Sequence, residues 1–292
     1  MAGKRTDKLL INICLAASAV VFIVSLGALS NTLYKSHTET TLFDRLACMY
    51  EGSDSMPSAE SPYGNQIIGI GSGGSAAGNY DDNDKFRSEY SDQTGSSDTS
   101  SYELRRDEHF QTIESINSDF CLWLSVPDTD INYPVVQNKD NPEYYLHRDF
   151  YKQKSYAGTP FLGANCEPDS EVIIIYSHNM KDGSMFGGLD RYKDKQYWSE
   201  HGELKLGTEY GEKTYKIFGA FETSINNGEF IYPGLTGDLD EEKYDRLVTD
   251  IISRTQYETG VIPEYGERIV MLSTCSYHTK GGRYIVAAVR TD

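Results

Sequence analysis

The chain has 292 residues, a formal net charge of −17 at pH 7 and a mean hydropathy of −0.52. Binding to nucleic acid needs clustered Lys and Arg that neutralise phosphates, so the strongly negative net charge argues against a nucleic-acid partner. Its five cysteines are too few for the disulfide framework of a small secreted domain. Four of these cysteines lie beyond residue 30, namely Cys48, Cys121, Cys166 and Cys275. They could form two disulfide bridges, one bridge or none.

An uncharged apolar run occupies residues 9–29. Its 21 residues are about the number that a helix needs to cross roughly 30 Å of hydrocarbon. The basic residues near it lie mainly before it, within residues 1–8, and such residues stay on the cytoplasmic side of a membrane. The run therefore predicts a transmembrane signal-anchor helix that crosses the cell membrane once. The tail at 1–8 is then cytoplasmic, and the rest of the chain lies on the extracellular face.

A cleaved signal peptide is the alternative for the same run, because signal peptides also begin with basic residues and an apolar core. The run is longer than the usual core of about 7–15 residues, although residues 28–30 resemble a weak cleavage site. We therefore favour an uncleaved anchor. In either case the rest of the chain is exported.

A polar stretch separates the apolar run from the remainder of the chain. Residues 51–101 hold 8 Gly and 12 Ser and few large apolar side chains, so they bury too little surface to offset the cost of ordering. We predict that residues 30–107 form a flexible linker that holds a folded domain, residues 108–292, away from the lipid. A low-complexity insert without any role fits the composition equally well.

Strand-like runs follow a short amphipathic stretch that begins at Glu108 and that we expect to be helical. The runs combine β-branched and aromatic residues and are separated by Gly, Asn, Asp and Pro. They span residues 121–126, 131–136, 171–176, 214–221, 268–274 and 283–289. This pattern indicates a mostly antiparallel β domain that is closed or nearly closed.

One further helix is predicted between these strands, at about residues 240–255. Asp238 followed by Glu241 resembles a capping box, in which two side chains satisfy the first free N–H groups of a helix. The apolar residues that follow recur on one helical face and are Tyr244, Leu247, Val248, Ile251 and Ile252.

Two of the apolar runs end in side chains that can carry chemistry, one at His178 and the other at Cys275. After Cys275 the chain holds seven residues and then begins another strand at Arg283, which predicts a hairpin that brings Arg283 back beside Cys275. A thiolate attacks a carbonyl carbon, an imidazolium protonates the departing amine, and a guanidinium donates to the developing oxyanion. Together the three residue types suffice for acyl transfer.

Other interpretations of the same residues stay open at this point. A single cysteine at a strand end is more often a small core residue, and a lone histidine is more often structural. Cys275 and His278 also form a C-x-x-H pair that Cys166 or His178 could complete as a metal site, although no second closely spaced ligand pair exists. His278 is likewise an alternative acid to His178.

The segments that carry these residues resemble the sortase family. MLSTCSYHTKGGR at 271–283 is similar to the T-L-x-T-C signature and its following arginine, with Met271 where the signature usually has Thr. IIIYSHNMKDGSMFGGLDRY, which contains His178, resembles the histidine segment of class B sortases, with Ser177 where a glycine is common. INYPVVQ at 131–137 and YYLHRDF at 144–150 add to the resemblance, which covers residues 108–292.

The resemblance implies a mostly β fold, namely a closed eight-stranded sortase-type β-barrel with a helical insertion before the cysteine strand. It makes Cys275 the nucleophile, His178 the proton donor and Arg283 the stabiliser of the oxyanion. Ser273 and Leu146 occupy places that line the substrate groove in similar proteins. Tyr284 is added as a substrate-binding candidate only because it is next to Arg283. No cofactor and no metal are implied.

The activity implied is that of a cysteine transpeptidase. It would cut a C-terminal sorting signal of secreted proteins and pass the thioacyl intermediate to an amine of a peptidoglycan precursor or stem peptide. A pilin-polymerising sortase that uses a lysine acceptor is one alternative. A catalytically silent, membrane-tethered binding or scaffold protein is another.

Overall fold

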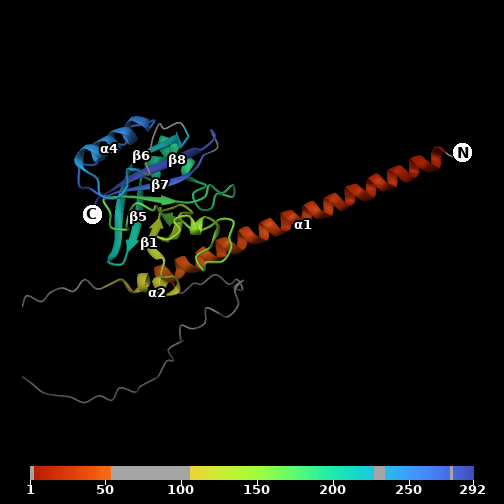
Figure 1. Ribbon diagram of the computed structural model, residues 1–292, viewed down its shortest axis with the longest axis horizontal. Helices are drawn as coiled ribbons and strands as arrows, with labels where there is room; N and C mark the ends of the chain where they lie inside the picture. Colours follow the sequence, from red (N-terminus) through yellow and green to blue (C-terminus); the bar gives the residue numbers. More distant parts are fainter. Residues whose placement is uncertain (1–2, 54–105, 227–233, 277–278) are drawn as a thin grey trace, which may run out of the picture. The chain divides into compact units, whose positions relative to one another are not determined.

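Eight strands form a closed barrel in a computed structural model that describes residues 3–53, 106–226, 234–276 and 279–292 (Figure 1). The described residues belong to one compact unit. Around the barrel the strands follow the order β1-β2-β3-β4-β7-β8-β6-β5. They are β1 Phe120–Ser125, β2 Asn132–Val136, β3 Phe161–Leu162, β4 Val172–Tyr176, β5 Glu203–Thr208, β6 Gly211–Ser224, β7 Ile269–Cys275 and β8 Gly282–Arg290.

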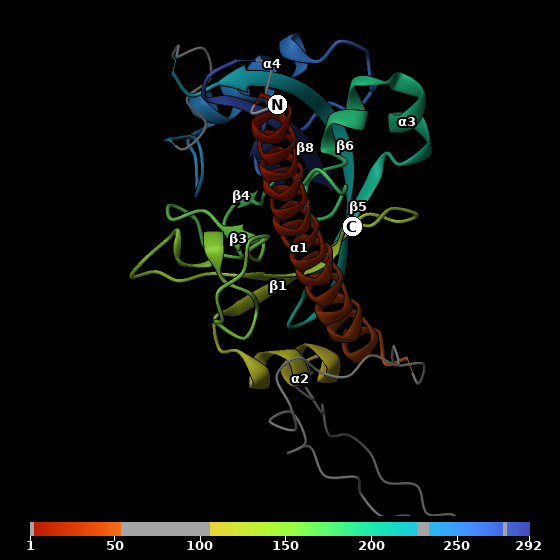
Figure 2. The ribbon, with the colours of Figure 1, turned by 90° about the vertical axis from the view of Figure 1, so that its right-hand side faces the viewer.

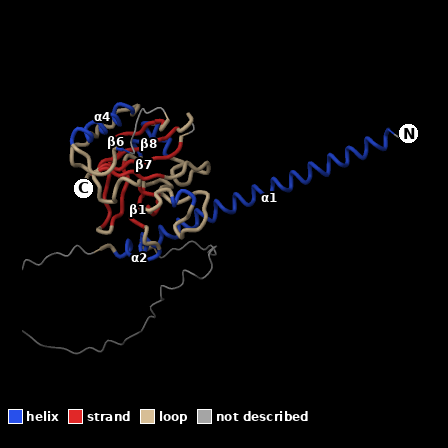
Figure 3. The backbone as a smooth tube through the Cα atoms, viewed as in Figure 1, coloured by secondary structure: helices blue, strands red, loops and turns tan. Residues whose placement is uncertain are grey.

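Neighbouring strands are antiparallel except in two pairs, β2 with β3 and β4 with β7, which are parallel. The closed, mostly antiparallel barrel expected from the sequence is therefore confirmed. Figure 3 shows the strands in red, gathered in one part of the molecule. Strands β3 and β5 are not among the strand-like runs predicted from the sequence. β3 has only two residues, which are too few to show a pattern. Its residue Phe161 pairs with Val136 of β2, which lies 25 positions earlier in the chain.

The core lies inside the barrel, where β4, β7 and β8 are buried along almost their whole length. Strands covered on both faces lose the alternation of apolar and polar residues, which explains the continuous apolar runs of β4 and β7. A helix covers part of the outer face. It is α4, Glu241–Arg254, and it packs on β6 (Figure 1). A side chain at Gly219 of β6 would collide with Ile251, so glycine permits this close approach.

The predicted helix is present as α4, but its first turn differs from the prediction. Asp240, not Asp238, caps the helix by accepting a hydrogen bond from the backbone N–H of Lys243 at 2.9 Å. Asp238 instead accepts from the backbone N–H of Glu171 at 3.1 Å. Ile252 was assigned to the apolar face and is 38% exposed, so the buried face is narrower than expected.

Helix α1, Gly3–Glu51, corrects the predicted linker. Residues 30–51 are helical, and the end of α1 buries Leu42, Phe43 and Leu46. Tyr50 then stacks on Trp123 of β1 with ring centroids 4.4 Å apart. These apolar residues recur at helical spacing, a signal that the polar composition of the following segment obscured. Residues 54–105, which make up most of the rest of the predicted linker, lie outside the described ranges.

In α1, the first side chain that the structure describes is that of Val20. Within the described residues, no helix is both long enough and apolar enough to cross a membrane.

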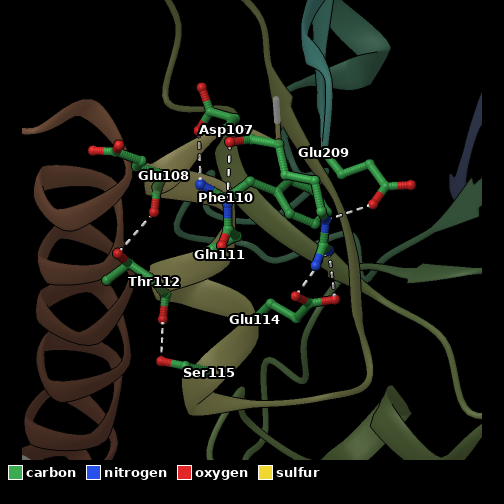
Figure 4. A network of polar contacts seen from close by, with 9 residues as sticks. Asp107, Glu108, Phe110, Gln111, Thr112, Glu114, Ser115 and Glu209 are labelled. Atoms are coloured by element: carbon green, nitrogen blue, oxygen red, sulfur yellow. Dashed lines mark hydrogen bonds and ion pairs between the residues drawn. The ribbon is translucent and has the colours of Figure 1, made fainter. Parts of the chain in front are cut away.

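Helix α2, Glu108–Ile116, is the helix expected at the start of the folded domain (Figure 2). Asp107 caps it by accepting from the backbone N–H of Phe110 at 2.8 Å. The side chains of Glu114 and Glu209, labelled in Figure 4, form ion pairs with Arg106 at 2.9 Å and 2.7 Å. The remaining short helices are η2 Tyr144–His147, η3 Leu189–Lys193 and α3 Lys195–Glu200.

Candidate active site

The parallel pair β4 and β7 brings His178 and Cys275 to the same rim of the barrel. Tyr176 of β4 is in register with Ser273 of β7, so both candidate residues follow two positions later. The pairing continues past the end of β4, where the backbone N–H of Ser177 donates to the carbonyl of Ser273 at 3.2 Å. Parallel strands that stay in register place their next residues side by side. The two apolar runs indicated that His178 and Cys275 could meet at one end of a sheet, but not that their strands are paired.

The antiparallel pair β7 and β8 places Arg283 directly opposite Cys275. Directly opposed residues have Cβ atoms about 4.5–5.5 Å apart. The hairpin predicted from the sequence is thus confirmed. Gly281 has a φ of 74°, the positive value that glycine adopts without strain. His278, the alternative acid, lies outside the described residues.

Cys275, His178 and Arg283 line one cavity of about 430 Å³. Leu146 and Ser273, the two groove residues implied by the resemblance, line the same cavity. Its walls are largely apolar and also include Phe161, Ile174 and Ile225. The cavity therefore places a nucleophile, an imidazole and a cation beside an apolar surface that a peptide could cover.

Tyr284 is not brought to this cavity. Successive residues of a strand point to opposite faces, so Tyr284 faces away from Arg283. It is 1% exposed, and the ammonium of Lys193 lies 5.5 Å from its ring centroid. Burial raises the pKa of its hydroxyl. Proximity in sequence was the wrong signal for this residue.

The His178 ring is held by η2. Its Nε2 lies 2.8 Å from the carbonyl oxygen of Leu146, and because a carbonyl oxygen only accepts, Nε2 carries a proton. The ring also stacks on His147, with centroids 5.4 Å apart and planes 21° apart. The Leu146 backbone thus fixes the orientation of the imidazole, a role that sequence reasoning missed because it belongs to a main-chain atom.

Two side-chain hydrogen bonds also tie the end of β4 to the end of β7. The Asn179 side chain donates from Nδ2 to the carbonyl oxygen of Cys275 at 2.7 Å. Thr274 donates from Oγ1 to the carbonyl oxygen of Ser177 at 2.9 Å. These contacts hold the segments that carry His178 and Cys275 at a fixed separation. No sequence signal identified Asn179, since its partner is 96 positions away.

Arg283 is partly buried in the cavity wall. Its Nη1 donates to the carbonyl oxygen of Gly282 at 3.0 Å. Among the described residues it forms no ion pair. A cation without a carboxylate partner at the rim of a peptide-sized cavity is suited to stabilise negative charge that develops there.

Three other cysteines, outside the cavity, are also free thiols within the part of the chain that the structure describes. Cys48, Cys121 and Cys166, like Cys275, form no disulfide. Burial raises the pKa of the Cys121 and Cys166 thiols, which favours their unreactive form. Within the described ranges, no group of three ligating side chains could hold a metal ion.

Comparisons with known proteins agree on one family. A model of the sortase domain matches residues 124–291. The chain is 33% identical to sortase B of Listeria monocytogenes over 172 residues, which cover 58% of this chain and 68% of that protein. It is 27% identical to sortase B of Staphylococcus aureus over 183 residues, covering 61% and 73%. The crystal structure of Clostridium perfringens sortase B is 28% identical and matches with a TM-score of 0.57 over 62% of this chain and 99% of that chain.

Proposed function

Because the chain belongs to the sortase family and is most like class B sortases, we propose that it is a cysteine transpeptidase that anchors secreted proteins to the cell wall. Its donor substrate is a protein with a C-terminal sorting signal, and its acceptor is an amine of a peptidoglycan precursor or stem peptide. One observation carries the proposal. Cys275 lies opposite Arg283 and shares a cavity with His178.

In the first half-reaction the Cys275 thiolate attacks the carbonyl carbon of the scissile peptide bond. The C=O π electrons move to oxygen, where the Arg283 guanidinium donates to the negative charge. The C–N bond then breaks, and the departing amine takes a proton from the His178 imidazolium. Since Nε2 of His178 is engaged by Leu146, Nδ1 is the nitrogen left to transfer that proton. The product is a thioester on Cys275.

In the second half-reaction the acceptor amine attacks the thioester carbon. Neutral His178 takes the proton of the attacking amine, and Arg283 again faces the oxyanion. The C–S bond breaks and returns the thiolate, leaving a new amide. The apolar walls around Leu146 and Ile225 limit the access of water, which would otherwise hydrolyse the thioester.

We also propose that residues 9–29 anchor the chain in the cell membrane, with the barrel outside. The residues of α1 within this run give partial support, because large apolar side chains from Val20 to Leu29 are 55–68% exposed. Exposed apolar side chains in succession indicate contact with lipid or another apolar surface. Protease added to intact wall-less cells should release the barrel, and protection until lysis would exclude this orientation.

Mass spectrometry of cell-wall proteins from cells with and without the gene tests the activity. We expect secreted proteins with a common C-terminal motif to lose their link to wall peptides in the absence of the gene and to regain it with the wild-type gene, but not with Cys275→Ala. Links between pilin subunits that vanish instead would indicate a lysine acceptor. An unchanged set of linked proteins would favour the silent scaffold.

A further inference from the structure

A buried hydroxyl beside the reacting residues has no hydrogen-bond partner among the described residues. Five residues with hydroxyl groups line the cavity, Tyr176, Ser177, Thr236, Ser273 and Thr274. Thr274 donates to a backbone carbonyl, and Tyr176, Thr236 and Ser273 each have an interaction partner. Ser177 differs, since its Oγ is buried and forms no hydrogen bond with any described residue.

The fold does not use this hydroxyl. The backbone N–H of Ser177 already donates to Ser273 at 3.2 Å, and its carbonyl already accepts from Thr274 at 2.9 Å. The residue is only 8% exposed, so an unpaired hydroxyl there costs free energy in the folded protein. Unpaired buried polar groups are rare and often belong to a functional site.

The position of Ser177 links it to both reacting side chains. It immediately precedes His178, and it is hydrogen-bonded to the two residues before Cys275. The serine side chain has one heavy-atom torsion with staggered positions, so rotation can turn Oγ into the cavity that the residue lines. A peptide carbonyl entering the cavity leaves water and needs a new donor.

We propose that the Ser177 hydroxyl donates a hydrogen bond to a main-chain carbonyl oxygen of the sorting peptide next to the scissile bond. The inference rests on the proposed transpeptidase function. Ser177 is then a substrate-binding residue, whose donor is unpaired in the free enzyme and satisfied in the complex.

This arrangement predicts opposite effects on stability and turnover. Ser177→Ala should raise the melting temperature by about 2–4 °C, because it removes an unpaired buried group, and lower kcat/KM about 3- to 10-fold. Tyr284→Phe is the matched control. Tyr284 Oη is also buried without a partner among the described residues, but it does not line the cavity. This variant should gain stability in the same way and keep the wild-type kcat/KM.

The probe is the eight-residue peptide that wild-type protein cleaves best from a randomised library, with hydroxylamine as acceptor and the hydroxamate detected by mass spectrometry. Versions of this peptide carry sulfur in place of one non-scissile carbonyl oxygen at a time, since sulfur accepts hydrogen bonds poorly. At one position next to the scissile bond, the thioamide should lower kcat/KM for wild type but not further for Ser177→Ala.

The outcomes separate the two proposals. A wild-type protein that cleaves no library member overturns the transpeptidase function, and this inference with it. If wild type cleaves the peptide and Ser177→Ala retains full kcat/KM, only the role of Ser177 is overturned. The role of Ser177 would also be overturned if, at every thioamide position, the loss of kcat/KM from the thioamide simply added to the loss from Ser177→Ala. Such additivity would mean that the effect of the substitution is purely structural and does not depend on any one carbonyl.

Discussion

Arg106 and Arg283 are both partly buried arginines, yet their surroundings differ. Arg106 forms ion pairs with the carboxylates of Glu114 and Glu209. Arg283 has only a backbone carbonyl for a partner among the described residues. A paired charge contributes to the structure it joins, whereas a cation left without a carboxylate in a cavity remains available to a substrate. The contrast separates structural from functional charge within one chain.

His178→Ala tests the functional side of the contrast and should have the largest effect. Without the imidazolium the amine leaves unprotonated, so we expect turnover to fall by about 10²–10⁴-fold. Peptide cleavage kinetics measure the loss. His201→Ala, which alters a histidine that does not line the cavity, is the control. Equal losses in both variants would mean that unfolding, not chemistry, is responsible.

Arg283→Lys should have the next largest effect on turnover. Lysine keeps the charge but loses the planar fork of donors, and loss of one oxyanion donor costs about 2.7–4 kcal/mol, or roughly 10²–10³ in kcat. KM should change less than kcat, because the lost contact forms mainly in the transition state. Arg106→Lys serves as the matched control and should keep the wild-type turnover, because Arg106 pairs with carboxylates of the protein and does not face the cavity. Wild-type turnover by Arg283→Lys would remove Arg283 from the mechanism.

Thiol labelling compares the reactivity of the cysteine in the cavity with that of cysteines elsewhere in the barrel. Burial raises the pKa of Cys121 and Cys166, so at pH 8 both should remain largely protonated. The thiolate fraction falls about tenfold for each unit by which the pKa exceeds the pH. Iodoacetamide followed by peptide mapping should therefore modify Cys275 faster than Cys121 or Cys166. Comparable rates at all three would contradict the selective reactivity of Cys275.

The sequence predicted the β7–β8 hairpin because both strands and their connection lie within 22 consecutive residues, so that Cys275 and Arg283 meet through local geometry. It could not show how His178 is oriented. That depends on a backbone carbonyl of Leu146, 32 positions away, and a main-chain atom leaves no mark in a residue pattern. The packing of α1 was missed for a different reason. Its contact residues alternate with polar ones just before a segment rich in Gly and Ser, and the composition of that segment dominated the assignment.

The smallest expected effect is on the structural side. Arg106→Ala removes both ion pairs, but the side chains are partly exposed, and exposed pairs contribute little to stability. We expect the melting temperature to fall by roughly 2–4 °C at low salt while kcat/KM of the folded protein stays at the wild-type value. The difference should shrink at about 1 M salt, because ions screen exposed charges over a few ångströms.

Lys243→Ala breaks an exposed pair with Asp240 on α4 and shows how much one such contact contributes elsewhere. A loss of turnover in Arg106→Ala that persists below its melting temperature would mean that the charge at Arg106 acts on the cavity, and the division between structural and functional arginines would not hold.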